Sequence, residues 1–342
     1  MGIRGYLDLA RLQTAGATAT VPVYGYLGAN AGRGGPLPDP LADPLVLTLF
    51  ATGFFAHIWG FVHNEIADRA TDARAGTLRP KPLPSGQASL AGAWALALAG
   101  LVVTLGCAVW VSWRTDAAFL VLVAAACALA GAYNILGKRF AGGDALLALS
   151  IFTFVGAGAA AAESYLALTD PGVLLLAALA GSVLFFNNAF EGGYKDHASD
   201  AAGGKRTLVN VLRARGEKYG SPDGLVVLAH WPLHVLMFGL AAWAAAGPLS
   251  AGEPAWDLGR VAAAGALVGL MGRSFVRGVA ADDRKRMLTF FSLHEFLAVL
   301  LLLTTLAPFL APAHLALLLL APLAWYVAYN RVAYGTAAAP NV

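Results

Sequence analysis

Residues 45–62 read LVLTLFATGFFAHIWGFV, and residues 63–86 continue as HNEIADRATDARAGTLRPKPLPSG. The first part is almost wholly apolar, which is typical of a helix that crosses a membrane. Asn64, Asp68 and Asp72 follow at intervals of four residues, so a continuing helix would carry them on one face. Arg79-Pro80 ends the helix soon afterwards, because proline breaks a helix interior. The stretch therefore predicts three oxygen-bearing side chains where a membrane helix meets water.

A second acidic segment, residues 187–208, reads NNAFEGGYKDHASDAAGGKRTL. It also follows an apolar run, and its Asp196 and Asp200 are again four residues apart. Carboxylates at the edge of a membrane indicate function, and a row of them suits Mg²⁺, which takes one or two carboxylates together with phosphate oxygens. Lys205 and Arg206 would neutralise the phosphate charge that remains. The two segments together predict a site for a diphosphate bound through Mg²⁺.

The composition is that of a membrane protein. Of the 342 residues, 58% are hydrophobic and only 13% are charged, against about 25% charged residues in soluble domains. Cys107 and Cys127 both lie in apolar runs, so we interpret them as buried apolar side chains rather than as disulfide or metal ligands. We expect a single transmembrane domain over residues 1–342, surrounded by the lipid bilayer, and no nucleic-acid partner.

Ten segments are candidates for membrane helices by length and composition. They are residues 14–31, 45–66, 88–113, 116–136, 144–164, 172–192, 225–246, 258–279, 290–309 and 313–334. No strand pattern is evident between them. The sequence therefore predicts an all-α, polytopic membrane protein with nine to ten transmembrane helices, the lower number applying if one end segment is atypical.

The Lys and Arg residues are distributed unevenly over the connections between these segments. With ten helices, all of the 23 except Arg33, Arg114 and Arg260 fall on one face of the membrane. Basic residues favour the cytoplasmic face, so we expect that face to be cytoplasmic and the membrane to be the plasma (inner) membrane. Both acidic segments, in the connecting regions of about 64–87 and 192–220, lie on this face and could form one site.

Other polar residues near this face are candidates for the same site. Tyr133, Lys138 and Arg139 close the fourth segment, where the tyrosine could hydrogen-bond a phosphate oxygen and the cations could contact a diphosphate. Asn187 and Asn188 lie within the sixth segment. Because an unpaired amide in lipid is costly, we expect these two side chains to line an interior cavity.

These motifs resemble those of the UbiA superfamily of intramembrane prenyltransferases. NEIADRATD is similar to the first aspartate motif of the family, NDxxDxxxD, and RPKPLPSG is similar to the segment that follows it. YNILGKR resembles the stretch after the fourth helix of the family, and YKDHASDAAGGKRTL resembles the second aspartate motif. Glu65 stands where the family usually has aspartate, and Gly192 and Gly193 stand at positions that are often acidic.

The resemblance covers residues from about 45 to 210 and implies a helical fold around a central cavity that is open to lipid and capped by cytoplasmic loops. It implies that the aspartates of the two motifs are catalytic and that Mg²⁺ is held by Asn64, Asp68, Asp72, Asp196 and Asp200. The diphosphate contacts that it implies are Arg79, Tyr133, Lys138, Arg139, Lys205 and Arg206.

The implied function is Mg²⁺-dependent transfer of an isoprenyl group from a prenyl diphosphate to an aromatic or lipid acceptor within the membrane. The diphosphate would leave, and the acceptor would capture the carbocation behind walls that exclude water. Two alternatives within the family are a terpene cyclase and a lipid-phosphate phosphoribosyltransferase. A transporter of a phosphorylated solute is an alternative of a different class, for which inverted repeats with broken helices at the bilayer midplane would be expected. A non-catalytic scaffold is a further alternative.

Overall fold

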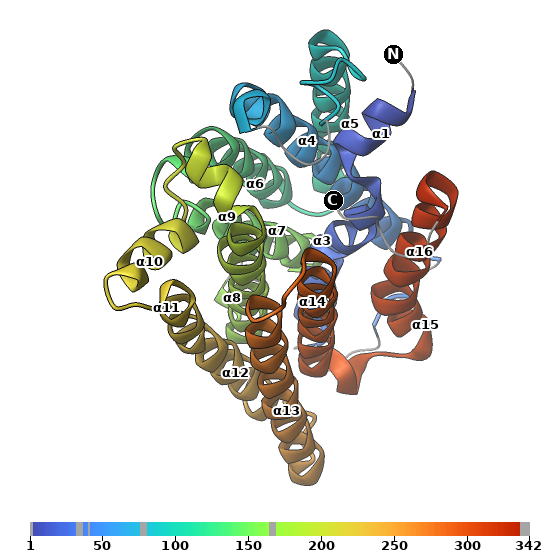
Figure 1. Ribbon diagram of the computed structural model, residues 1–342. Coiled ribbons are helices and arrows are strands. Elements are labelled where there is room, and N and C mark those ends of the chain that lie inside the picture. The colour runs from blue at the N-terminus through green and yellow to red at the C-terminus, as the bar shows by residue number, and fades with distance from the viewer. Residues whose placement is uncertain (1–2, 32–36, 40–41, 76–80, 164–168, 336–342) are drawn as a thin grey trace.

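The computed structural model describes residues 3–31, 37–39, 42–75, 81–163 and 169–335, which are helical with short connections and form no strand. In Figure 1, α7 and α8 lie at the centre, with α4–α6 above them, α12 and α13 below, and α14 to the right of α8. The helices are α1 (Ile3–Ala10), η1 (Leu12–Thr14), α2 (Ala15–Ala19), α3 (Val21–Ala31), α4 (Pro44–Ala75), α5 (Leu90–Arg114), α6 (Ala117–Leu136), η2 (Gly137–Arg139), α7 (Ala145–Glu163), α8 (Pro171–Phe186), η4 (Asn187–Gly192), α9 (Gly193–Ala202), α10 (Leu208–Glu217), α11 (Pro222–Ala229), α12 (Trp231–Ala246), α13 (Pro254–Val279), α14 (Arg284–Leu306), η5 (Ala307–Phe309), α15 (Pro312–Leu315), η6 (Ala316–Leu320) and α16 (Ala321–Tyr334). The predicted all-α membrane fold is confirmed.

Eight helical stretches in the described part of the chain are long and apolar enough to cross a membrane. They are Pro44–Ala73, Leu90–Arg114, Ala117–Arg139, Ala145–Ala162, Pro171–Ala202, Pro222–Ala246, Arg284–Phe309 and Pro312–Ala333. The predicted count of nine to ten is therefore slightly too high. The two predicted segments that do not qualify are 14–31 and 258–279.

Each of these two segments departs from a simple membrane helix for a physical reason. Segment 14–31 is divided among η1, α2 and α3, with Pro22 near the start of α3, where proline is tolerated. Segment 258–279 lies in α13, which is long enough but contains four charged residues. One of them, Arg260, is buried and donates to the backbone oxygens of Thr304, Thr305, Ala245 and Leu249.

Side chains that cap helix N-termini explain where several helices begin. The oxygen of such a side chain accepts a hydrogen bond from a backbone N–H that has no partner inside the helix. Six helices begin in this way after Ser89, Asp116, Asp170, Thr207, Ser221 and Asp283. Each cap is a serine, threonine or aspartate directly before an apolar or amphipathic run, so the starts of these helices are encoded locally.

Glycine allows two helices of the core to approach very closely. A Cβ atom on Gly25 of α3 would lie 1.8 Å from the backbone oxygen of Val155 in α7, and a Cβ on Gly158 of α7 would lie 1.8 Å from the backbone oxygen of Pro22. Small residues at such crossings are typical of membrane helices, which associate by close packing. This contact fixes α3 against α7 in the interior of the protein.

Both acidic segments continue membrane helices beyond their apolar parts. The first lies at the C-terminal end of α4, which runs for 32 residues without interruption. The second begins in η4, a six-residue π-helix, and continues into α9. A π-turn inserts an extra residue into a helix and is frequently found at functional sites. The helix ends thus carry the acidic side chains toward one another.

A separate polar cluster is buried among aromatic rings between α8, α12, α13 and α14. His294 Nδ1 lies 3.2 Å from a carboxylate oxygen of Glu191, and His294 Nε2 lies 3.2 Å from Nε2 of His234. Phe186 stacks on the His294 ring, with ring centroids 4.4 Å apart. These side chains are almost completely buried and do not line the cavity described below.

Candidate active site

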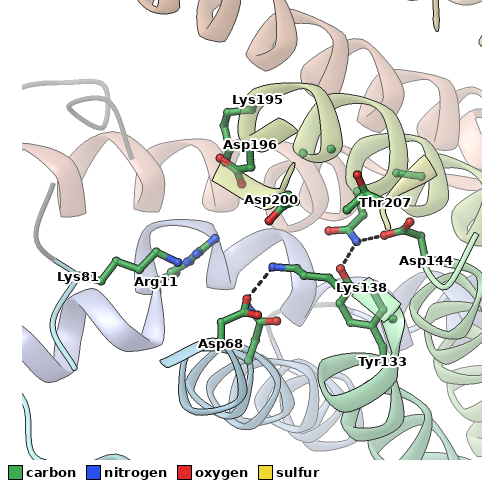
Figure 2. Close-up of a pocket in the computed structure, with 16 residues that line it drawn as sticks. Arg11, Asp68, Lys81, Tyr133, Lys138, Asp144, Lys195, Asp196, Asp200 and Thr207 are labelled. Carbon is green, nitrogen blue, oxygen red and sulfur yellow. Dashed lines mark hydrogen bonds and ion pairs between the residues drawn. The ribbon is translucent and has the colours of Figure 1, made fainter. Parts of the chain in front are cut away.

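A polar cavity of about 130 Å³ lies where α4, α6, α7 and α9 come together. Both acidic segments contribute to its wall, as do the N-terminal region and the turn between α6 and α7 (Figure 2). The lining residues are Arg11, Asn64, Asp68, Lys81, Tyr133, Gly137, Lys138, Asp144, Asn188, Ala189, Gly192, Gly193, Lys195, Asp196, Asp200 and Thr207. The predicted candidates Asn64, Asp68, Tyr133, Lys138, Asn188, Asp196 and Asp200 are therefore gathered around one space.

Asp68 is the centre of the charged part of the cavity. Lys138 Nζ donates to Asp68 Oδ2 at 2.6 Å, and Lys205 Nζ donates to Asp68 Oδ1 at 3.2 Å. Lys205 also lies 3.2 Å from Asp200 Oδ1. One lysine thus connects the acidic segment of α4 with that of α9, although the two are far apart in the sequence.

The turn between α6 and α7 depends on two glycines. A Cβ on Gly143 would lie 2.0 Å from the backbone oxygen of Gly137, and a Cβ on Gly137 would lie 2.3 Å from the Tyr133 ring. The backbone can therefore fold back on itself only without side chains at these positions. This turn places Lys138 and Asp144 on the same cavity.

A second group of ion pairs borders the cavity on its N-terminal side. Arg11 Nη2 donates to Glu65 Oε1 at 2.6 Å, and Lys81 Nζ donates to Asp72 Oδ2 at 2.8 Å. Lys81 also lies 3.6 Å from Glu65 Oε2. Burial alone would lower the pKa of the Arg11 guanidinium, but Glu65 and other carboxylates attract its charge and the net pKa is raised. Arg11 thus remains a cation at the cavity.

The opposite side of the cavity is formed by three hydrogen-bonded residues. Asn188 Nδ2 donates to the Tyr133 hydroxyl at 2.5 Å and to Asp144 Oδ1 at 2.6 Å. Figure 2 shows Asp144 and Thr207 on one side of Lys138, with Arg11, Lys81 and Asp68 on the other. Burial raises the pKa of the Asp144 carboxyl above its usual range, and the bond from Asn188 opposes this only in part.

The remaining predicted residues lie at or beyond the edge of the cavity. Asp72 is paired with Lys81 beside the cavity, and Lys205 is paired there with Asp200. The exposed side chains of Arg139 and Arg206 do not line the cavity. The backbone N–H of Arg206 nevertheless donates to the backbone oxygen of Lys138 at 3.1 Å and ties the two basic segments together. Asn187 does not line the cavity, and Arg79 lies outside the described residues.

Four charged residues of the cavity were not identified as site residues from the sequence. Arg11 and Lys81 had been counted only as basic residues of one face, and Lys195 lies beside a predicted aspartate in α9. Asp144 had no partner at helical spacing, so nothing distinguished it from a solvated loop aspartate. For Arg11, the available signal was its position directly before an apolar segment on the face of the acidic motifs.

The oxygen-rich lining fits a hard divalent cation. Asn64, Asp68, Asp196 and Asp200 all present oxygen atoms on one cavity, and oxygen ligands are those that Mg²⁺ prefers. Within the described residues no three His, Cys, Asp or Glu side chains converge closely enough to hold an ion on their own. This agrees with Mg²⁺ chemistry, in which one or two carboxylates act together with water and phosphate oxygens.

The comparisons with known proteins agree with this geometry. The sequence model of the UbiA prenyltransferase family matches residues 21–294, which is more than half of the chain. None of the curated proteins matches the chain. Two solved structures are similar in fold, a UbiA homologue from Aeropyrum pernix K1 and one from Archaeoglobus fulgidus bound to GPP and Mg²⁺.

The similarity to these structures extends over nearly their whole length. The Aeropyrum pernix protein is 19% identical, with a TM-score of 0.61, and the match covers 86% of this chain and 98% of that one. The Archaeoglobus fulgidus protein is 18% identical, with a TM-score of 0.60, and the match covers 89% and 99%. A further structure of a homologue from Archaeoglobus fulgidus, bound to DMAPP and Mg²⁺, gives 20% identity, a TM-score of 0.55 and coverage of 89% and 98%.

Proposed function

The chain belongs to the UbiA prenyltransferase family, and we propose that it transfers an isoprenyl group from a prenyl diphosphate to an acceptor in the membrane, with Mg²⁺ as cofactor. One observation carries this proposal. Lys205 lies between Asp68 and Asp200 and is paired with both, Lys138 is also paired with Asp68, and Asp68, Asp200 and Lys138 line one cavity. The Archaeoglobus fulgidus homologue is bound to GPP and Mg²⁺ in one structure and to DMAPP and Mg²⁺ in another, which supports the same substrate class here.

In this proposal the acidic residues of both segments hold the metal. The residues concerned are Asn64, Asp68, Asp72, Asp196 and Asp200, all of them at or beside the cavity. Bound Mg²⁺ would neutralise part of the negative charge that develops on the departing diphosphate. Several carboxylates gathered without such a charge would repel one another, which explains why lysines pair with them in the structure described here.

The basic residues would contact the phosphate oxygens. Lys138 and Lys205, which are held by Asp68 in the structure, can exchange this carboxylate for a phosphate oxygen once a metal occupies the acids. Arg11 and Lys81 approach the same cavity from the other side, and the Tyr133 hydroxyl supplies a neutral hydrogen-bonding group. Arg79, Arg139 and Arg206 remain in this proposed set because the family resemblance implies that they contact the diphosphate.

Ionisation then requires positioning and charge stabilisation rather than a nucleophile from the protein. The C–O bond of the allylic diphosphate breaks, its electron pair leaves with the diphosphate, and the cations of the cavity stabilise that charge. The prenyl chain would extend from the cavity into the membrane between the helices, which accounts for an active site at the end of membrane helices. The acceptor attacks the carbocation and loses a proton.

We further propose that residues 1–342 form a single domain in the plasma (inner) membrane, with the active site facing the cytoplasm. The distribution of Lys and Arg supports this orientation, because both connecting regions that carry the acidic segments, about 64–87 and 192–220, are rich in basic residues. Reaction at that face would give the enzyme access to diphosphates made in the cytoplasm.

Release of diphosphate by the purified protein in lipid nanodiscs tests the proposed function. Prenyl diphosphates of several lengths are supplied with a panel of acceptors, in Mg²⁺ or in chelator, and the products are identified by mass spectrometry. The proposal expects release that requires Mg²⁺ and an acceptor. Cyclic products without an acceptor would assign a terpene cyclase, and a phosphoribosylated lipid would assign the phosphoribosyltransferase. Transport of a phosphorylated solute without bond cleavage would overturn the enzyme assignment.

A further inference from the structure

Asp144 forms a part of the cavity that is chemically distinct from the metal site. It lies directly before α7, is 8% exposed and faces the cavity together with Tyr133 and Asn188. Asn188 bonds Asp144 and the Tyr133 hydroxyl with the two hydrogens of its Nδ2 atom. These bonds fix the carboxylate in place without neutralising it, whereas Asp68, Asp72 and Asp200 are paired with lysines.

No counter-ion holds Asp144 among the residues that the structure describes. The charged and titratable groups nearest to it are Lys138, at the end of η2, and Tyr133, on α6. Lys138 is engaged by Asp68 at 2.6 Å, and the tyrosine is neutral under ordinary conditions. From η4, on the other side, Asp144 is met by the uncharged amide of Asn188. A buried carboxyl without a paired cation is suited to take up a proton, and burial raises its pKa toward the range where it can do so.

The acceptor must lose one proton when it takes up the prenyl group. The residues assigned to the metal and the diphosphate cannot accept this proton. The acids of the two segments are occupied by cations, and the lysines and Arg11 are already protonated. The base must reach the acceptor on the side of the cavity away from the diphosphate. In Figure 2 Asp144 lies opposite Arg11 and Lys81 with respect to Lys138, so it is placed for an acceptor that binds away from these two cations.

We propose, on the basis of the proposed function, that Asp144 is the general base that removes the proton of the acceptor, and that the acceptor presents an uncharged hydroxyl group to it. The acceptor oxygen, or the ring carbon that it activates, forms the bond to the prenyl C1 atom after the C–O bond to diphosphate has broken. The electron pair of that bond leaves with the diphosphate, and the hydroxyl proton passes to a carboxylate oxygen of Asp144 and then to water.

The same geometry specifies which acceptors are disfavoured. A carboxylate on the acceptor near the reacting hydroxyl would lie beside Asp144, and two like charges at such a distance repel strongly in a partly desolvated site. Tyr133, Asn188 and Thr207 of this wall are neutral, and the nearest cation, Lys138, is engaged by Asp68. We therefore expect the enzyme to prefer a neutral phenol or alcohol over the same molecule carrying an adjacent carboxylate by at least tenfold in kcat/KM.

The test compares Asp144→Asn with Asp116→Asn in nanodiscs. Asp116 caps the start of α6, away from the cavity, and asparagine caps a helix equally well, so this matched control should behave as the wild type. Asp144→Asn should bind a non-hydrolysable prenyl thiodiphosphate with Mg²⁺ within about threefold of the wild type. Transfer to a neutral phenol should fall on the order of 10²–10⁴-fold, the usual contribution of a general base.

The pH dependence distinguishes a base from a structural residue. In the wild type kcat/KM should fall as the pH is lowered through the pKa of Asp144, because the protonated carboxyl cannot accept a proton. This acid limb should disappear in Asp144→Asn and return in Asp144→Glu. An unchanged rate and pH profile in Asp144→Asn, with an active wild type, would overturn the inference while leaving the proposed function intact.

A second measurement does not depend on the fold of the variant. The wild type is assayed with a neutral phenol and with the same phenol carrying a carboxylate next to the reacting hydroxyl. A preference for the neutral compound supports the assignment, and a preference for the carboxylate overturns it, even if Asp144→Asn loses prenyl thiodiphosphate binding. Failure of the wild type to consume any prenyl diphosphate in Mg²⁺ would instead overturn the proposed function and, with it, this inference.

Discussion

Removing Lys205 should have opposite effects on the binding of Mg²⁺ alone and on the binding of Mg²⁺ with a prenyl diphosphate. Its Nζ atom lies 3.2 Å from Asp68 Oδ1 and 3.2 Å from Asp200 Oδ1, and its side chain is only 11% exposed. In the free protein this ammonium neutralises two carboxylates that the metal would use. In the loaded protein the same ammonium would face the diphosphate. Lys205→Ala therefore frees the metal ligands and weakens the substrate site.

The magnitudes follow from these distances. A pair of unit charges 4 Å apart is worth about 4 kcal/mol at an effective dielectric constant of about 20. Because the lysine can partly swing away when the metal enters, we take about 1.4 kcal/mol as the competition that remains, which is a factor of about ten in affinity. Mg²⁺ alone should thus bind roughly tenfold more tightly to Lys205→Ala. Loss of one hydrogen bond to a charged group, about 1.5–3 kcal/mol, should weaken prenyl thiodiphosphate binding by roughly 10–100-fold.

Isothermal titration calorimetry in nanodiscs measures both affinities on the same preparation. Mg²⁺ is titrated first, and prenyl thiodiphosphate is then titrated at saturating Mg²⁺. Lys218→Ala is the matched control, because Lys218 is an exposed residue at the end of α10 that does not line the cavity. Weaker binding of Mg²⁺ alone by Lys205→Ala, or unchanged binding of the thiodiphosphate, would refute the reasoning that one lysine serves both acidic segments and the substrate.

The structure also predicts the direction in which three further substitutions change stability or substrate binding. Gly143→Ala should lower the melting temperature far more than Gly142→Ala. A Cβ atom at position 143 would lie 2.0 Å from a backbone oxygen, whereas a Cβ atom at position 142 would meet nothing within 4 Å. The alanine at position 142 would cost only about 1–2 kcal/mol, because of the positive φ there. His294→Phe should lower the free energy of unfolding by about 1–3 kcal/mol, because it leaves the buried polar group of Glu191 without the imidazole that it faces, and adding Glu191→Gln should recover part of this loss. Arg11→Ala should raise the KM for prenyl diphosphate roughly tenfold, because it removes a charge-assisted contact from the cavity, and Arg11→Lys should restore part of it.

Thermal unfolding in detergent and steady-state kinetics check these three changes. Equal melting temperatures for the two glycine variants would show that the turn between α6 and α7 can relax. If the double change of Glu191 and His294 is no more stable than His294→Phe alone, the two side chains do not depend on each other. A lower kcat with an unchanged KM in Arg11→Ala would place the guanidinium away from the bound diphosphate.

Features that depend only on the spacing of residues along one helix were predictable from the sequence. Asn64, Asp68 and Asp72 lie on an unbroken helix because a spacing of four fixes them on one face whatever surrounds that helix. The spacing of Asp196 and Asp200 works in the same way in α9. The distribution of basic residues indicated that these two helix ends share a face, and the structure brings them to one cavity.

Features that depend on tertiary contacts were not predictable in this way. Arg11 reaches Glu65 from a short turn between α1 and η1, where its φ of 44° is a local departure that no periodicity reveals. Asp144 lies at the cavity because the backbone of Gly143 packs closely against the backbone of Gly137. The helix count was too high because segment 14–31 is divided into short helices, and because the helix that contains 258–279 carries four charged residues, among them Arg260, whose guanidinium is held by backbone oxygens.

The central claim is that the two acidic segments act on one diphosphate. A structure determined with Mn²⁺ and a prenyl thiodiphosphate, with the metal located by its anomalous scattering, tests it most directly. The account predicts metal density between the acids of α4 and α9, in contact with the diphosphate, and predicts that Lys138 and Lys205 have left Asp68 for phosphate oxygens. Metal bound to only one of the two segments, or a diphosphate that lies elsewhere while both lysines still pair with Asp68, would contradict it.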